Sequence, residues 1–352
     1  MRTTPLDDLA SRDAGNADAD VFVEEICDNG LDDDLDGAQD CEDAQCLEDP
    51  ACEEVPHWVA YVTTSGLPAV SLVRSDTLEV IPVDGDGATT IATAPWFHPD
   101  GTTLAYVYGD ELGSGVRLLD LRTGEHRLLQ VDGVTQYGHP SISPDGELMV
   151  TQVVRGTRAD VVVFDLSSGD VRADLAAPDD LSFFSAPVWA GDSETLVAHA
   201  GTRTEGGIFG NGIAEIGRLD LETGSVTELT ADARPIGSSA WWPDRGIVLV
   251  ESQTAGQLVG VDPYAEAPVR TFELPLVAGS SDTSCRPIRG TLAACVRRNN
   301  VDQRSVTDIA LVDLGDGTLV RRLTVTPQVN EASPSPSSAD ARTLDPITPL
   351  SL

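Results

Sequence analysis

Five aspartates near the start of the chain have the spacing of a calcium-binding loop. Counted from the first, they occupy positions 1, 3, 5, 9 and 12 of such a loop: Asp32, Asp34, Asp36, Asp40 and Asp43. Gly37 falls at position 6, where glycine permits a sharp turn, and Ala38 at position 7 offers its backbone carbonyl. Clustered carboxylates repel one another unless a cation lies between them, and Ca²⁺ prefers oxygen ligands. The spacing therefore predicts a Ca²⁺ site formed by these five carboxylates and the Ala38 carbonyl.

The same segment differs from a plain acidic linker and from an EF-hand. Aspartate-rich sequence is often a solvated run, but a linker has no reason to combine a glycine with four cysteines in this register: Cys27, Cys41, Cys46 and Cys52. Position 12 is Asp43 rather than the longer Glu, which leaves bidentate closure open, and no helices flank the loop. We expect a metal-binding unit over residues 21–54 that is not an EF-hand.

The chain has six cysteines, and two of them, Cys285 and Cys295, lie far from the other four. Disulfides in an oxidising compartment are the favoured interpretation. Free thiols and zinc remain alternatives, although no C-x-x-C or Cys/His spacing indicates zinc. Cys285 and Cys295 lie symmetrically about Gly290, the middle of an expected hairpin, so they should face each other across two strands. We predict a Cys285–Cys295 disulfide.

The rest of the sequence shows no catalytic constellation, and we predict no catalytic residue. Five histidines are scattered along it: His57, His98, His126, His139 and His199. None forms an H-x-x-x-H pair or an evident triad partner for a serine, and there is no G-x-S-x-G motif or phosphate loop. We expect His98 and His139 to cap turns rather than bind metal. The aspartates of three Pro-Asp turns should cap backbone groups as well: Asp100, Asp145 and Asp244.

Charge and hydropathy limit the classes of partner. The chain has 58 acidic and 22 basic residues, a formal charge of -36, and every basic residue is arginine. Such a field repels phosphate backbones and anionic lipid, so we expect no nucleic-acid or membrane-surface partner. The 41% of hydrophobic residues can form a large core. No run approaches the roughly 18 apolar residues of a transmembrane helix, so no direct membrane span is expected.

A repeat of about 45 residues organises the chain from Val55 onward. Equivalent turn positions fall at spacings of 45, 47, 52, 44 and 52 residues: Pro99, Pro144, Gly191, Pro243, Pro287 and Ala339. Each unit has a short strand, a Pro-Asp-Gly turn, an apolar strand and an alternating strand that ends in Asp-Leu. The Thr-Gly, Ser-Gly or Asp-Gly pair that follows predicts a two-residue hairpin turn into a fourth strand. Four antiparallel strands per unit predict a β-propeller blade.

Both ends of the repeat region contribute to one blade. Five complete units start at residues 95, 140, 187, 239 and 284, and residues 57–83 supply later strands without an opening strand. The segment "ASPSPSSADARTL" near the C-terminus supplies that strand and removes the open sheet edges. We therefore expect an all-β, six-bladed propeller over residues 55–346, after a flexible acidic tether (1–20) and the Cys/Asp unit (21–54), and before a short tail (347–352). Four tryptophans should pack between blades at one repeated position: Trp96, Trp189, Trp241 and Trp242.

Two segments resemble known families. The turns "PSISPDGELMV" and "APWFHPDGTTLAYVYGD" resemble the repeats of TolB-like six-bladed propellers, over most of residues 57–344, although Gly191-Asp192-Ser193 and "RPIRG" depart from the pattern. The N-terminal unit resembles short Cys/Asp-rich metal-binding repeats of secreted bacterial proteins and, more loosely, the calcium repeats of thrombospondin type 3. Leu35 stands where those repeats usually have a cysteine. Of the three possible connectivities we favour Cys27–Cys41 with Cys46–Cys52.

The resemblance to TolB-like propellers implies an envelope-associated binding platform rather than an enzyme. We expect a monomeric, exported binding or scaffold protein on a calcium-binding stalk, with a protein partner or a component of the cell envelope. The alternative is a hydrolase or lyase with a metal-assisted site in the propeller channel. The expected location is the periplasm, the cell surface or the extracellular space. The first twenty residues contain no apolar signal core, which leaves the export route open.

Overall fold

The computed structural model describes residues 56–337, except residues 65, 85–89, 112, 179–182, 203–212, 231–234, 253–256, 267–271, 274–281, 302–303, 316 and 325–330. The chain divides into two units between Val55 and Pro56, and every described residue belongs to the second unit. The predicted tether, Cys/Asp unit and C-terminal tail therefore lie outside the described residues.

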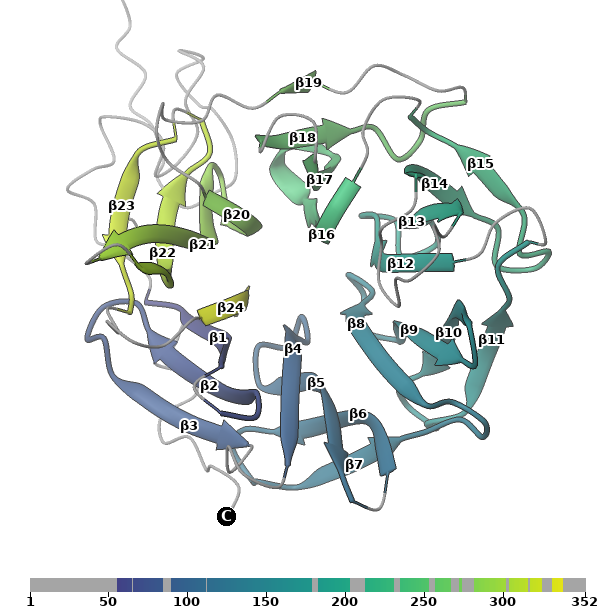
Figure 1. Ribbon diagram of the computed structural model, residues 1–352, viewed down its shortest axis with the longest axis horizontal. Helices are drawn as coiled ribbons and strands as arrows, with labels where there is room; N and C mark the ends of the chain where they lie inside the picture. The colour runs from purple at the N-terminus through teal and green to yellow at the C-terminus, as the bar shows by residue number, and fades with distance from the viewer. Residues whose placement is uncertain are drawn as a thin grey trace, which may run out of the picture. The chain divides into compact units, whose positions relative to one another are not determined.

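The described residues form an all-β propeller of four-stranded antiparallel blades (Figure 1). Three sheets follow the chain order. The first has β4 (Ile91–Phe97), β5 (Thr103–Asp110), β6 (Gly113–Asp120) and β7 (His126–Leu129). The second has β16 (Pro235–Trp242), β17 (Ile247–Ser252), β18 (Gln257–Val261) and β19 (Phe272–Glu273). The third has β20 (Asp282–Arg289), β21 (Leu292–Val301), β22 (Arg304–Asp313) and β23 (Leu319–Arg322).

An eight-stranded sheet combines two antiparallel groups of four strands. One group has β8 (Gln136–Ile142), β9 (Leu148–Arg155), β10 (Arg158–Asp165) and β11 (Val171–Leu175). The other has β12 (Phe183–Trp189), β13 (Leu196–Thr202), β14 (Ile213–Leu219) and β15 (Val226–Glu228). The two groups are joined by one parallel pair, Ala159 with Phe183.

The remaining sheet confirms that the two ends of the repeat region form one blade. Its strand order is β24 (Glu331–Pro336), β1 (Trp58–Thr63), β2 (Ala69–Arg74) and β3 (Val80–Asp84). The first strands of all these sheets surround a common centre (Figure 1). Each contacts the next around that centre, and the series closes: β24, β4, β8, β12, β16, β20 and β24 again.

Burial falls from the middle of each blade to its outer strand. β10 reads RADVVVFD, and all its residues between the two ends are buried, because a central strand has a blade packed on each face; these residues are apolar except Asp160. The outer strands β7 and β23 are mostly exposed. Trp58, Trp189 and Trp242 are at most 1% exposed and are among the largest side chains in the core.

The hairpin turns after Asp-Leu are longer than the sequence predicts. β6 ends at Asp120 and β7 begins at His126. The Asp120 N–H donates to the Glu125 carbonyl, and the Gly124 N–H donates to the Asp120 carbonyl. Four residues therefore lie between the closing pair, and the predicted two-residue turn is wrong. Gly124 takes the left-handed conformation (φ 73°) that the turn requires.

The predicted disulfide is confirmed. Cys285 on β20 and Cys295 on β21 are bonded, with 4.0 Å between their Cα atoms. Both side chains are buried in the core beside Trp242. Such a bond favours an oxidising compartment. Among the described residues, no helix has the length and apolar character needed to cross a membrane.

A buried ion pair joins two neighbouring blades. Asp84 ends β3 and pairs with the guanidinium of Arg117 on β6. The same carboxylate accepts a hydrogen bond of 2.6 Å from the Tyr106 hydroxyl on β5. Arg117 also lies 3.4 Å from the ring centre of Tyr108. Burial raises the pKa of Tyr106, as does the Asp84 carboxylate, so the phenol remains protonated.

The variant Asp84→Asn should lower the free energy of unfolding by about 3 kcal/mol, because it leaves the Arg117 charge buried without its carboxylate. Denaturant unfolding followed by fluorescence measures this. The matched control is Asp170→Asn, whose side chain is exposed, and its unfolding should change by less than about 0.5 kcal/mol. Equal effects of the two variants would show that the ion pair does not hold these blades together.

The disulfide closes a short loop, and its removal by Cys285→Ala with Cys295→Ala should lower the free energy of unfolding by about 2 to 3 kcal/mol. Mass spectrometry of the unreduced wild-type protein should find one peptide pair linked through these two cysteines. Free thiols at both positions would contradict the bond.

Candidate functional site

A cavity of about 230 Å³ lies where the turns after the inner strands converge. Its wall is mainly aromatic and proline side chains: Trp96, Phe97, Trp189, Trp241, Pro99, Pro144, Pro243, Pro287 and Pro336. Arg286 and His98 are the titratable residues among its described lining, and no aspartate or glutamate is among them. We call this the axial cavity. A concave, mostly apolar pocket with few polar groups is the usual form of a ligand site.

The inner strands share a β-bulge shortly before the residues that line this cavity. The ladder between each first and second strand is interrupted by a register shift. In four of these strands a residue other than glycine takes a positive φ of 46° to 50° at the shift: Ala94, His139, Ala186 and Ser284. Such residues are uncommon and cluster at functional sites, and bulges redirect side chains. Two residues after Ala94 and Ser284 come Trp96 and Arg286, which both line the cavity.

The tryptophans occupy three positions of the repeat, not the single position predicted from the sequence. Counted back from the equivalent turn positions Pro99, Gly191 and Pro243, Trp96 lies three residues before its turn, Trp189 and Trp241 two, and Trp242 one. Trp189 and Trp242 are buried between blades, and their indole N–H groups donate to the carbonyls of Ser141 and Gly290, as expected for core residues. Trp96 and Trp241 are only partly buried.

Trp241 and the cavity wall depend on one glycine. A Cβ atom at Gly191 would lie 2.7 Å from Cζ2 of Trp241. The turn Gly191-Asp192-Ser193 therefore lacks the usual proline and has a glycine at the point where the indole ring approaches the backbone. This close approach gives a structural reason for the departure of this repeat from the Pro-Asp-Gly pattern.

Arg286 is the charged group of the axial cavity and is not among the site residues predicted from the sequence. It is 5% exposed, its Nη1 atom donates to the Pro95 carbonyl at 2.9 Å, and its guanidinium lies 4.2 Å from the ring centre of Trp96. Its Nε atom is buried without a hydrogen-bond partner. Among the described residues no carboxylate pairs with it. Burial lowers the pKa of Arg286 to about 9, so it is charged at neutral pH.

His139 lies near this charge, and His199 lies near His139. Burial lowers the pKa of His139 to about 4, and the positive charge of Arg286 adds to the effect. Burial lowers the pKa of His199 to about 3, with a contribution from His139. Both imidazoles are therefore neutral at pH 7. His139 is in the bulge of β8 and does not cap a turn, so that prediction is wrong.

His199 and Ser239 form a pair with a separation of 2.9 Å between Nε2 and Oγ. Such a pair could activate a serine for acyl transfer. Both residues are buried, with 3% and 4% of their surface exposed, and no carboxylate among the described residues is bonded to His199. Neither residue lines the axial cavity, so the pair joins two blades rather than forming an accessible nucleophile.

The turn residues confirm most of the predicted capping roles. Asp100 accepts hydrogen bonds from the N–H groups of Thr102 and Thr103, and Asp145 accepts one from Glu147. Asp244 lies in the 3-10 helix η4 (Pro243–Arg245), where no such bond to described residues is found. His98 also serves its turn, since its Nδ1 accepts the Asp100 N–H.

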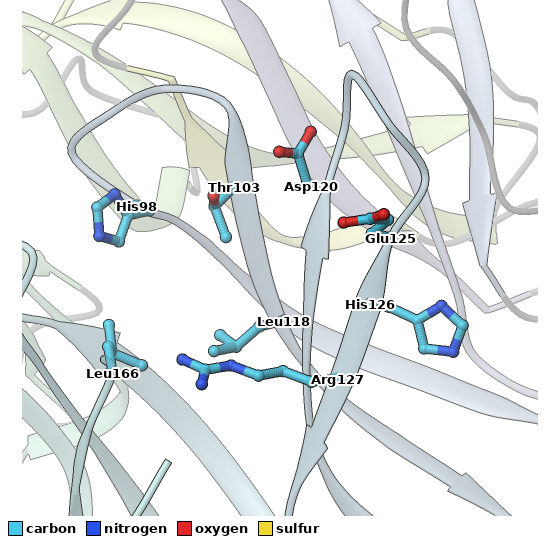
Figure 2. Close-up of a pocket in the computed structure, with 8 residues that line it drawn as sticks. All are labelled: His98, Thr103, Leu118, Asp120, Glu125, His126, Arg127 and Leu166. Carbon is cyan, nitrogen blue, oxygen red and sulfur yellow. The ribbon is translucent and has the colours of Figure 1, made fainter. Parts of the chain in front are cut away.

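A second pocket lies between neighbouring blades, beside His98. It has a volume of about 370 Å³, and Figure 2 shows the guanidinium of Arg127 extending across it toward Leu166. Asp120 and Glu125 lie near the loop between β6 and β7. Asp120 already caps this loop by accepting the N–H groups of Arg122 and Thr123. Since no buried polar group is left unpaired among its described lining residues, this pocket is the weaker candidate.

The predicted calcium ligands and four of the predicted disulfide cysteines lie outside the described residues: Asp32, Asp34, Asp36, Ala38, Asp40, Asp43, Cys27, Cys41, Cys46 and Cys52. They remain predictions. Within the described part of the propeller, no group of three or more His, Cys, Asp or Glu side chains is placed to hold a metal ion. The sequence-based alternative of a metal-assisted channel site therefore gains no support from these residues.

No protein-family model and no curated protein matches the sequence. Solved structures do resemble the fold. TolB from Acinetobacter baumannii has a TM-score of 0.58 at 18% identity, over 80% of this chain and 66% of that chain. A chain of the nidogen/laminin complex has a TM-score of 0.58 at 10% identity, over 80% of this chain and 98% of that chain. Hydrazine synthase from Kuenenia stuttgartiensis has a TM-score of 0.60 at 12% identity, over 81% of this chain and 47% of that chain.

These similarities establish a TolB-like propeller fold and nothing about activity. The chain spans about two thirds of the TolB chain and about half of the hydrazine synthase chain. One of the three proteins is an enzyme by name, and identities this low show the fold alone.

The contact between His98 and Asp100 predicts a pH dependence of stability. Burial lowers the pKa of His98, but the hydrogen bond and the charge of Asp100 outweigh it, so the net pKa is raised above 6.5. A raised native pKa stabilises the fold at pH below the unfolded value, and this contribution disappears as pH rises through the native pKa.

Urea unfolding at pH 5.5 and pH 8 should therefore show a smaller stability difference between wild type and His98→Gln at pH 8, by up to about 1 kcal/mol. The control Leu128→Ala changes an exposed residue of β7 that does not titrate, and its difference from wild type should be the same at both pH values. A His98→Gln difference that stays constant or grows with pH would contradict the assignment.

Proposed function

We propose that the chain is an exported, non-enzymatic binding protein, a TolB-like propeller carried on a calcium-binding stalk. The propeller has six blades if the eight-stranded sheet is counted as two blades. This count is reasonable because a single parallel residue pair, Ala159 with Phe183, joins β8–β11 to β12–β15. The stalk consists of the tether (1–20) and the Cys/Asp unit (21–54), with Ca²⁺ at the aspartate loop. The protein acts as a monomer in the periplasm, at the cell surface or outside the cell.

The observation that carries this proposal is the composition of the axial cavity. Aromatic and proline side chains form its wall, and Arg286 is its charged group. Aromatic residues and arginine contribute most of the binding energy at protein interfaces. The partner is a protein or a component of the cell envelope that inserts a group into this cavity. The strongly negative chain disfavours nucleic acid as that partner.

A catalytic role has less support. The His199–Ser239 pair is buried, and the described residues include no cluster suited to a metal. The alternative hydrolase or lyase would need its catalytic groups in segments outside the described residues. We therefore propose binding as the function.

Capture of partners from the envelope fraction of the source organism tests the proposal. Full-length wild type should retain a specific protein or envelope component, and Trp241→Ala should reduce the retained amount at least fivefold, because Trp241 forms part of the cavity wall. The matched control is Tyr264→Ala, an exposed aromatic residue outside that wall. Equal retention by both variants would show that the partner does not use the axial cavity.

Calcium titration of the full chain tests the stalk. It should show saturable Ca²⁺ binding that is lost when Asp32, Asp34 and Asp36 are replaced by Asn, since these carboxylates would be ligands. Unchanged Ca²⁺ binding by this variant would contradict the assigned loop.

A further inference from the structure

We propose that the axial cavity binds a single carboxylate group, with the guanidinium of Arg286 as its counter-ion and Trp96 as the surface on which that guanidinium is held. This deepens the proposed function, on which it rests, by naming the chemical class of the group that the cavity receives. It follows from the charge, the hydrogen bonds and the lining of the cavity.

Arg286 carries a buried positive charge that no carboxylate among the described residues compensates. A buried guanidinium without a carboxylate is costly, because burial removes the water that would solvate it. Arg286 is 5% exposed, and among the described residues it has one hydrogen bond, to the Pro95 carbonyl, and one aromatic contact, to Trp96. Its Nε–H is buried without an acceptor. In a chain with a formal charge of -36, carboxylates are abundant, yet none is paired with this arginine among the described residues.

The charge of the site limits the anion that it can accept. His139 interacts with Arg286, and His199 interacts with His139; both are neutral at pH 7 because burial lowers their pKa values to about 4 and about 3. His98 lines the same cavity but is engaged with Asp100 and the Gly146 carbonyl. Arg286 is thus one positive charge, which matches a monoanion. A phosphate dianion would bring an excess negative charge into a strongly negative protein.

The orientation of the Arg286 guanidinium suits a carboxylate. Arg286 belongs to β20 but is held in a fixed orientation by two residues of β4. One guanidinium nitrogen donates a hydrogen bond to the Pro95 carbonyl, and one face of the guanidinium packs against Trp96. Its remaining N–H groups present a planar set of donors, which carboxylates match with two acceptor oxygens. The apolar wall around it suits the hydrocarbon part of the same ligand.

The carboxylate could belong to a small organic acid or to the end of a peptide. Both sources offer the same group to Arg286, and the volume of about 230 Å³ accommodates one side chain or a small acid. The two sources are therefore distinguished by experiment rather than by the chemistry of the site.

The test is NMR of the full-length protein labelled with ¹⁵N-arginine, in which the Nε–H signal of Arg286 is followed directly. This signal should be recognisable by its ring-current shift from Trp96 and by its absence in Arg286→Lys. The probes are sodium phenylacetate, the tripeptide acetyl-Gly-Gly-Phe with a free carboxyl terminus, and the same peptide as its amide.

We expect a saturable shift of the Arg286 signal with phenylacetate, the free-acid peptide or both, and none with the amide. Binding of the acid alone assigns a small-molecule site, and binding of the peptide alone assigns a peptide end. Because Arg286→Gln has no Arg286 signal, the affinities of the variants are measured by isothermal titration calorimetry with the same probes. Arg286→Gln should weaken binding at least tenfold, whereas the control Arg289→Gln, which changes an exposed arginine on the same strand, should not change it.

The proposal is overturned if the wild-type Arg286 signal shows no saturable shift with either acid up to 50-fold molar excess over a protein concentration in the millimolar range. It is also overturned if inorganic phosphate binds more tightly than the acids, or if the amide binds as well as the free peptide. These readouts use wild-type protein, so they hold even where Arg286→Gln fails to fold. Partner capture that still depends on Trp241 would then leave the binding function standing without the carboxylate.

Discussion

The whole structure depends on the pairing of two strands from opposite ends of the described chain. β24 forms an antiparallel ladder with β1, with Val59 opposite Pro336 and Ala60 opposite Ser335. Without β24, the inner edge of β1 would be an unpaired row of backbone donors and acceptors, which favours aggregation. The pairing is supported by contacts beyond the ladder, since the Ser337 N–H donates to the Trp58 carbonyl and the Ser335 hydroxyl accepts the Phe97 N–H. Closure therefore links the last strand both to its own blade and to the next one.

The same closure forms the candidate site. Ser335 and Pro336 of β24 line the axial cavity together with Trp96 of β4 and Arg286 of β20. Arg286 reaches past β24 to donate to Pro95 on β4, so its position is defined only when the ring of inner strands is complete. The bulges with positive φ at Ala94 and Ser284 are strained positions that the surrounding sheet holds in place. Stability and the proposed binding function thus depend on the same contacts.

Local sequence patterns predicted the blades well. The Pro-Asp-Gly turns and the apolar second strands are present because they are determined by local turn chemistry and by continuous apolar runs that are buried on both faces. The blade built from both ends is present because the repeat left a missing opening strand at one end and a spare one at the other. The pairing of Cys285 with Cys295 followed from symmetry about one turn. The turns after Asp-Leu were misjudged because Thr123-Gly124 and its equivalents are the last two residues of a four-residue turn rather than a complete two-residue turn.

The axial cavity could not be predicted in the same way, because it is formed by residues far apart in the sequence. Arg286 and Pro95 are 191 residues apart, and nothing local to either indicates their contact. In the ladder register, Arg286 stands at the inner-strand position where the blade of β4 has Trp96. A charged residue at this position marks a special environment, but the register itself is known only from the structure. The bulges, which depend on the twist of packed blades, left no residue type in common, since Ala, His and Ser all occupy them.

Native-state hydrogen exchange of the β1 amides tests the closure of the ring most directly. If β24 completes the blade, the amides of Trp58–Thr63 open only with global unfolding, and their free energies of exchange equal those of the central strands β9 and β10. Exchange of β1 through a local opening several kcal/mol below that of β9 and β10 would contradict the account, because it would mean that the two ends of the propeller part without unfolding the rest.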